Sequence, residues 1–450
     1  MITIKLKIET EEENKERILK YQKQYSNLLH VYFNRYKEGL SQTSCKHLEL
    51  NNVELLDSWF KQSCIYEAMG LVKRHKDKNI IFGGKKKFFD RMKNLITKEE
   101  FELKRLSPLY SIGEETNPSV KCNRKFFIQD FNTIIFKPSR KEKIELNIKV
   151  SSKKYKRYIE LLKEHQELKD LSITYKLNSE YIWISFDENI LKDEVKQFKK
   201  IENRILSIDM NPNYIGWSIV DWINSEKFNI VDKGVLSIKS LNDYENNLNV
   251  SSNDKKKIYI NNKRNFEVLQ CSKFLVEKMK HYKCSIFAIE DLNIKSSDKD
   301  RGKNFNKLVN NQWCRNKLVS NLEKWCNIYN IQFLKVKPEY SSFIGNLVFR
   351  YLKLPDMILS SIEISRRGYE FYHQYILKDK CIEKNIVFIA LTEQIKKLIC
   401  QSLEELSINV QEWNSLFDLY KFLKKSKCKY RFPLNLESFQ SNTLKFQLLI

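Results

Sequence analysis

Residues 204–209 read Arg-Ile-Leu-Ser-Ile-Asp, an apolar run that closes on the carboxylate of Asp209. This pattern predicts a buried strand. Two further strands are predicted over 214–220 and 229–238, and the short connections between them favour an antiparallel meander. A second apolar run, over residues 284–289, closes in the same way on Glu290.

Long helices are predicted between and after these strands. They cover about 255–281, 305–329 and 355–377, and a fifth strand is predicted over 331–336. The order β-β-β-α-β-α-β-α is that of the ribonuclease H-like (RuvC-type) fold. We therefore predict an α/β domain of this class over residues 201–377.

The first 200 residues have a different pattern, which predicts a separate nucleic-acid-binding region. A strand of alternating pattern over 2–8 is followed by a helical part within about 10–115, with helices predicted over 11–36 and roughly 58–73. Strands then dominate from about 117 to 190. We expect the latter part to form a barrel-like β module. The whole chain is thus predicted to be an α+β multidomain protein, in which residues 378–450 have no assigned role.

The 450-residue chain carries a large positive charge. Lys and Arg number 80 against 56 Asp and Glu, a formal net charge of +24. Nucleic acid is the usual partner of such a charge, because phosphate contacts release counterions, although translation of an AT-rich genome would also enrich Lys. We expect no membrane span and no signal peptide. The ten Cys include no C-x-x-C pair, so no zinc ribbon is evident and reduced cytosolic thiols are expected.

The two strand-ending acids, Asp209 and Glu290, are predicted to share a site. The first and fourth strands are expected to be parallel neighbours, so that both carboxylates open onto the same sheet edge. Two-metal hydrolysis of phosphodiesters needs acidic ligands around ions roughly 3.5–4 Å apart, and Mg²⁺ or Mn²⁺ prefers carboxylate oxygens. One acid at a strand end is often only the first polar residue of a loop, but two at matching places favour a metal site.

The third ligand is open between two interpretations. Asp356 follows Pro355 at the start of the last predicted helix. It is either a catalytic acid or an ordinary helix-start residue stabilised by the helix dipole. Glu363 is a weaker candidate. We expect Asp291, on the opposite face, to be a capping or structural acid, and the strand-end residues Asp221 and Asp232 to be solvated.

Clusters of basic residues are candidate nucleic-acid contacts. Lys and Arg neutralise phosphates while aromatic rings stack on bases, although each cluster is equally well a solvated basic face over buried rings. The last pair of residues either holds phosphate or forms surface ion pairs. The candidates are Lys85, Lys86, Lys87, Lys153, Lys154, Lys156, Arg157, Arg301, Lys303, Arg366 and Arg367.

Several stretches around these residues resemble one family. They are Ser-Ile-Asp-Met-Asn-Pro-Asn-Tyr-Ile-Gly-Trp-Ser-Ile-Val at 207–220, Phe-Ala-Ile-Glu-Asp-Leu-Asn at 287–293, Lys-Pro-Glu-Tyr-Ser-Ser-Phe-Ile-Gly at 337–345 and Ser-Ser-Ile-Glu-Ile-Ser-Arg-Arg-Gly at 360–368. Upstream, residues 82–88 and 123–128 add to them. In their order and spacing, over most of residues 80–375, the chain resembles the TnpB (OrfB) family of transposon-encoded relatives of type V CRISPR effectors.

This resemblance implies an RNA-guided, Mg²⁺-dependent DNA endonuclease whose catalytic acids and metal ligands are Asp209, Glu290 and Asp356. It implies that the N-terminal half grips a guide RNA and its DNA heteroduplex, without a small-molecule cofactor, in the cytoplasm of a prokaryotic cell or as a product of a mobile element or phage. Two features depart from the family. No Cys lies between Pro338 and Asp356, as in the TnpB-related accessory branch that lacks the zinc ribbon, and Asp356 is about one residue out of register with the usual third acid.

Two alternatives use the same scaffold. One is a DNA-binding protein with weak or no nuclease activity. The other is a RuvC-like resolvase that uses the same acids without a guide RNA.

Overall fold

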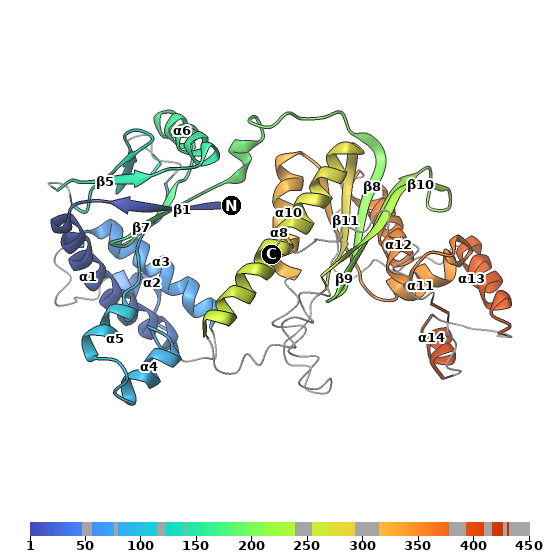
Figure 1. Cartoon of the computed structure of the whole chain (residues 1–450), viewed down its shortest axis with the longest axis horizontal. Coiled ribbons are helices and arrows are strands. Elements are labelled where there is room, and N and C mark those ends of the chain that lie inside the picture. The colour runs from blue at the N-terminus through green and yellow to red at the C-terminus, as the bar shows by residue number, and fades with distance from the viewer. Residues whose placement is uncertain are drawn as a thin grey trace. The chain divides into compact units, whose positions relative to one another are not determined.

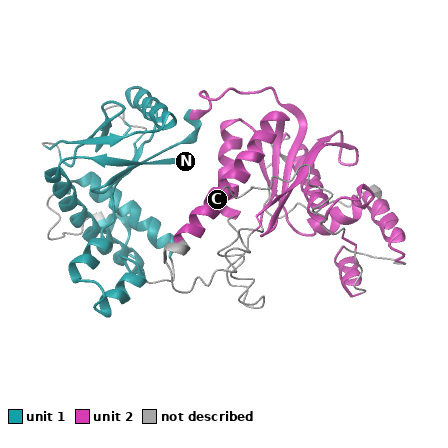
Figure 2. Cartoon of the chain, in the orientation of Figure 1, with its two compact units in different colours: residues 1–190 teal, residues 191–450 magenta. Residues whose placement is uncertain are grey.

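The structure is a computed structural model, and its parts are described in two compact units, Met1–Ile190 and Leu191–Ile450 (Figure 2). The fold is of the mixed α+β type, with one sheet in each unit. None of the helices among the described residues is long and apolar enough to cross a bilayer. The residues described are 1–46, 56–75, 80–114, 122–139, 142–238, 254–292, 315–377, 393–408, 416–425 and 430–431.

The first unit is built on a seven-stranded sheet. Its strands are hydrogen-bonded in the order β2-β6-β7-β1-β5-β4-β3, so the N-terminal strand lies in the middle. In that strand every second residue is buried, as the alternating sequence predicted. The strands are β1 (Ile2–Glu9), β2 (Leu109–Ser111), β3 (Phe126–Ile128), β4 (Thr133–Phe136), β5 (Ile144–Lys149), β6 (Thr174–Leu177) and β7 (Tyr181–Phe186).

The two ends of this sheet approach each other, which gives it a barrel-like form. The ring of Phe126 in β3 stacks on that of Tyr175 in β6, with centroids 4.7 Å apart. The buried Asn123 side chain bridges the same gap, because its amide donates to the carbonyls of Ser111 at 3.3 Å and Ile173 at 2.9 Å. The curled sheet therefore encloses a core rather than leaving two open edges.

Helices cover this sheet. The ring of Tyr21 in α1 and that of Phe60 in α3 both meet Phe136 of β4 edge-on, at 6.2 and 6.1 Å. The helix α6 was not predicted, and its Gln166 side chain exchanges hydrogen bonds with the backbone of Ile128 in the edge strand β3. The helices of this unit are α1 (Glu12–Lys37), α2 (Gln42–Lys46), α3 (Ser58–Arg74), α4 (Lys85–Met92), α5 (Lys98–Arg105), α6 (Lys153–Leu168) and the short η1 (Glu188–Leu191).

The second unit is built on a five-stranded sheet of order β10-β9-β8-β11-β12. The first three strands form the predicted antiparallel meander. The strand β11 is parallel to both β8 and β12, so the prediction that the first and fourth strands are parallel neighbours is confirmed. The strands are β8 (Ile201–Met210), β9 (Tyr214–Trp222), β10 (Phe228–Ser237), β11 (Cys284–Glu290) and β12 (Gln332–Val336).

Helices lie on both faces of this sheet (Figure 1). The helices α8 (Asp254–His281) and α10 (Arg315–Ile328) cover one face. The other face is covered by α12 (Asp356–Phe371), followed by the π-helical turn η5 (Tyr372–Ile376), and α11 (Ser341–Val348), with the turn η4 (Arg350–Leu352), packs against it. The helices α13 (Glu393–Glu405) and α14 (Leu416–Lys425) bury apolar residues in the same core, so part of the segment 378–450 belongs to this unit.

The helix α12 lies unusually close to the sheet because small residues line the contact. A Cβ atom on Gly216 of β9 would lie 2.4 Å from the carbonyl oxygen of Met357, so any larger residue would collide with the helix backbone. Further along, the Ser207 hydroxyl donates to the carbonyl of Ser361 at 2.7 Å. The start of α12 is therefore fixed directly above β8 and β9.

Candidate metal site at the edge of the five-stranded sheet

Asp209 and Glu290 lie in adjacent positions near the carboxyl ends of β8 and β11. The parallel register pairs Ile208 with Ile289, and the two acids are the next residues along each strand. Strand alternation turns both toward the face that α12 covers. Both are buried, with exposed fractions of 5% and 7%. The structure therefore brings together the two acids that the strand pattern had placed at one edge.

Asp356 is the first residue of α12 and lies near this pair. Asp209 is paired with Gly216 across β8 and β9, and Gly216 is the residue on which Met357 rests. The charge of Asp356 is close enough to raise the pKa of Asp209. Asp356 is thus a helix-start residue, as one interpretation has it, and the catalytic interpretation stays a prediction.

The electrostatics of these acids favour binding of a cation. Burial raises the pKa of Asp209, and the charges of Glu290 and Asp356 raise it further. Burial likewise raises the pKa of Glu290, against the opposing effects of Ser341, Arg367 and Arg315. Neighbouring buried carboxylates destabilise each other's ionised form, and a divalent cation between them would remove that repulsion.

Residues of α11 hold two of the three acids. The Ser341 hydroxyl donates to the Glu290 carboxylate, and the Asn346 amide donates to that of Asp356. Arg431 also faces Asp356, at 3.4 Å. In the described part of the chain, no three His, Cys, Asp or Glu side chains stand close enough together to enclose an ion unaided.

The donor set nevertheless matches a hard divalent cation in kind. Asp209, Glu290 and Asp356 supply only carboxylate oxygens, which Mg²⁺ and Mn²⁺ prefer. These are the residues that would hold the metal. The amide of Asn211, 3.3 Å from Asp209, orients that carboxylate from the side.

Arg366 and Arg367 are not surface residues, so the prediction that they contact phosphate or form surface ion pairs is wrong. Their exposed fractions are 1% and 4%. Both bind Glu363, which is fully buried, through nitrogen–oxygen distances of 2.8 to 2.9 Å. Glu363 is thereby engaged by two guanidinium groups, which excludes it as a free metal ligand. The spacing of apolar residues in α12 could not predict this burial, because the helix is buried on all sides and has no single apolar face.

The remaining acids of the sheet stand apart from the site. Asp221 forms a two-pronged ion pair with Arg204, both distances being 2.6 Å. Asp232 binds Lys278 at 2.6 Å. The prediction that these two acids are solvated is therefore wrong. Asp291 is exposed, which agrees with a role outside the site.

The basic clusters of the first unit lie on two helices. Lys85, Lys86 and Lys87 form the first turn of α4, and Lys153, Lys154, Lys156 and Arg157 lie on the first turns of α6. Apart from the half-buried Lys87, these seven side chains are exposed. The rings between them are partly core, since Tyr158 is buried. Arg301 and Lys303 lie outside the described residues.

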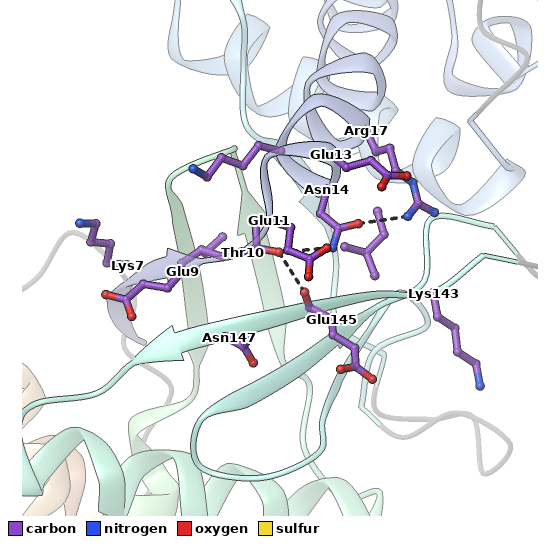
Figure 3. Close-up of a pocket in the computed structure, with 13 residues that line it drawn as sticks. Lys7, Glu9, Thr10, Glu11, Glu13, Asn14, Arg17, Lys143, Glu145 and Asn147 are labelled. Carbon is purple, nitrogen blue, oxygen red and sulfur yellow. Dashed lines mark hydrogen bonds between the residues drawn. The ribbon is translucent and has the colours of Figure 1, made fainter.

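A groove of about 970 Å³ in the first unit carries no comparable chemistry (Figure 3). It runs along the end of β1, where the Thr10 hydroxyl donates to the carbonyl of Glu145 at 3.3 Å. Its charged lining is balanced, with four acidic and four basic side chains. A groove with balanced charge has neither a positive field to attract a polyanion nor an excess of acids to bind a cation, so it is a weaker candidate site than the acids of the second unit.

Comparison with known proteins finds matches among the solved structures. No protein-family model matches the chain, and no curated protein matches it. Among solved structures it is similar to the protein of a Cas12f1-sgRNA-target DNA complex, with 14% sequence identity, a TM-score of 0.46, and coverage of 79% of this chain and 83% of that one. It is also similar to the protein of a CRISPR-Cas12f ternary complex, with 11% identity, a TM-score of 0.28, and coverage of 79% and 82%.

Proposed function

We propose that this chain is a metal-dependent nuclease of the ribonuclease H-like (RuvC) type that hydrolyses phosphodiester bonds in DNA under the guidance of an RNA. The observation that carries the proposal is the placement of two buried carboxylates side by side, with a third carboxylate at the start of the helix that packs on them. Asp209 and Glu290 come from neighbouring parallel strands, and Asp356 comes from the helix packed on them. Acids gathered under burial are costly unless they bind something positive.

The topology of the second unit supports the ribonuclease H-like assignment. Three antiparallel strands are followed by two parallel ones, in the order β10-β9-β8-β11-β12, with helices on both faces. Asp209 and Glu290 stand near the carboxyl ends of the neighbouring parallel strands β8 and β11. Open α/β sheets place their sites at such ends.

The residues would divide the chemistry as follows. Asp209, Glu290 and Asp356 would hold the metal, and Ser341 and Asn346 orient two of these carboxylates. When bound, Mg²⁺ or Mn²⁺ supplies a water of lowered pKa and stabilises the leaving oxygen. The buried walls formed by β8, β11 and α12 shield Asp209 and Glu290 from bulk water, whereas Asp356 is partly exposed.

The RNA guide and the DNA substrate are proposed from the sequence. The stretches that resemble the TnpB family surround the three acids, and the net charge of +24 suits a polyanionic partner. The exposed basic side chains at the starts of α4 and α6 are candidates for holding the backbone of an RNA–DNA heteroduplex. Base pairing would then select the target.

The test is cleavage of labelled DNA by the purified chain with its co-purified RNA and Mg²⁺. We expect Asp209→Asn and Glu290→Gln to abolish cleavage while DNA binding persists. The matched control is Asp291→Asn, which removes a neighbouring exposed carboxylate and should leave cleavage intact. A wild-type chain that binds DNA without cutting it would support the binding-protein alternative. Absence of RNA with preferential cutting of branched DNA would support the resolvase.

A further inference from the structure

A cluster of buried charges lies on α12, next to the turn 337–340 that follows β12. Glu363 sits between Arg366 and Arg367, and all three side chains are almost entirely buried. Buried ion pairs seldom add net stability compared with apolar packing. We therefore ask which neighbouring backbone or side chain these buried charges hold in place.

The two arginines differ in what else they bind. Arg366 turns to Glu370 on its own helix, at 2.6 Å. Arg367 leaves the helix, and one of its terminal nitrogens donates to the carbonyls of Lys337 at 2.6 Å and Glu339 at 2.9 Å. Arg367 therefore fixes the turn 337–340 to α12, whereas Arg366 only completes the charge cluster.

That turn determines where Ser341 stands. It leaves β12 beside Glu290, which is paired with Val336. It then ends at Tyr340, a residue with a left-handed backbone conformation (φ 59°) that turns the chain into α11. The first residue of α11 is Ser341, whose hydroxyl donates to the Glu290 carboxylate.

We propose that Arg367 is a positioning residue for Glu290. Its guanidinium holds the turn 337–340, and the turn presents the Ser341 hydroxyl to the carboxylate. A planar guanidinium serves this purpose because it binds Glu363 and two carbonyls at once, which a lysine ammonium cannot do in the same geometry. The inference rests on the proposed function to the extent that Glu290 is a metal ligand.

The experiment compares Arg367→Lys with the matched control Arg366→Lys in the full 450-residue chain. Both variants keep the positive charge beside Glu363, and each replaces one planar guanidinium, with its several N–H donors, by a single ammonium group. In metal-free protein, we expect hydrogen exchange of a peptide spanning 337–341 to rise only in Arg367→Lys. In an Mn²⁺ titration followed by electron paramagnetic resonance, that variant should bind about tenfold more weakly, the usual effect of losing a support of a metal ligand. The control should bind as the wild type does.

A second variant keeps the inference falsifiable if Arg367→Lys folds poorly. Ser341→Ala removes the last link without touching the charge cluster and should weaken Mn²⁺ binding to a similar degree. The double variant, Arg367→Lys with Ser341→Ala, should bind Mn²⁺ little more weakly than either single variant, because both changes act through one contact. Equal effects of the two arginine variants, or unchanged exchange over 337–341 in Arg367→Lys, would overturn the inference. A wild type that binds no Mn²⁺ would refute the proposed metal site instead, while hydrogen exchange would still decide whether Arg367 holds the turn.

Discussion

Replacement of Gly216 by alanine tests the close contact that places Asp356 near Asp209. The added Cβ would lie 2.4 Å from the carbonyl oxygen of Met357 and 2.6 Å from its carbonyl carbon. Ordinary contact begins near 3.4 Å, so the start of α12 must move by about 1 Å. Overpacking in a core costs about 1–3 kcal/mol, and we expect the upper end because the obstructing atoms belong to the helix backbone.

The assay is urea denaturation, with Mn²⁺ binding as a second measurement. We expect Gly216→Ala to lose about 3 kcal/mol of unfolding free energy and to bind Mn²⁺ more weakly, because Asp356 moves with the helix. The control is Gly70→Ala in α3, where an added Cβ meets nothing within 4 Å and helix propensity predicts a gain of about 0.5–1 kcal/mol. A Gly216→Ala chain within about 0.5 kcal/mol of the wild type would refute the close approach of α12 to β9.

Three further changes give separate expectations. Asn123→Ala should cost the first unit about 3 kcal/mol in urea denaturation, because it leaves several buried carbonyls and amides of the closed sheet unpaired; a loss under about 0.5 kcal/mol would contradict this. Burial and the Arg105 charge lower the pKa of His30 from 6.5 to about 4, so the unfolded chain binds the proton more readily. The folded state therefore favours the neutral His30 ring, and the stability that this preference contributes is present above pH 6.5 and is lost as the pH falls toward 4. His30→Gln should therefore reduce the loss of stability between pH 7 and 5, by about 1 kcal/mol because the ring is partly exposed; an acid response equal to the wild type's would count against it. Arg431→Ala should tighten Mn²⁺ binding by up to about fivefold, since the guanidinium no longer competes for Asp356; weaker binding would show that Arg431 supports the site.

Periodicity predicted the elements that have one clear buried face. The strand β1 alternates strictly, and α1 and α3 were predicted to within a residue or two of their observed ends. The helix α6 was missed because Lys and Arg dominate its first turns, so that its apolar spacing begins only at Tyr158. The short α11 was missed because eight residues hold too little periodic signal.

The candidate site divides in the same way. Asp209 and Glu290 were found because each closes an apolar strand, a signal contained in a few consecutive residues. Their supports, Ser341 and Arg367, act through contacts between residues 51 and 30 positions apart in sequence. No local pattern records such contacts. Arg367 was even assigned to the surface, because a charged residue in a helix is usually solvated.

The register of the third acid illustrates what packing decides and counting does not. Asp356 stands about one residue away from the place that the TnpB pattern assigns to it. In three dimensions its place depends on how closely α12 approaches its neighbours: Gly216 admits Met357, and Gly345 of α11 leaves no room for a Cβ beside the carbonyl of Leu359. A one-residue shift along a helix turns a side chain by about 100° and advances it by about 1.5 Å, yet the charge of Asp356 still raises the pKa of Asp209. The sequence offset is therefore not in itself a reason to exclude Asp356 as a ligand, and the distance set by these two glycines is the quantity on which its contribution depends.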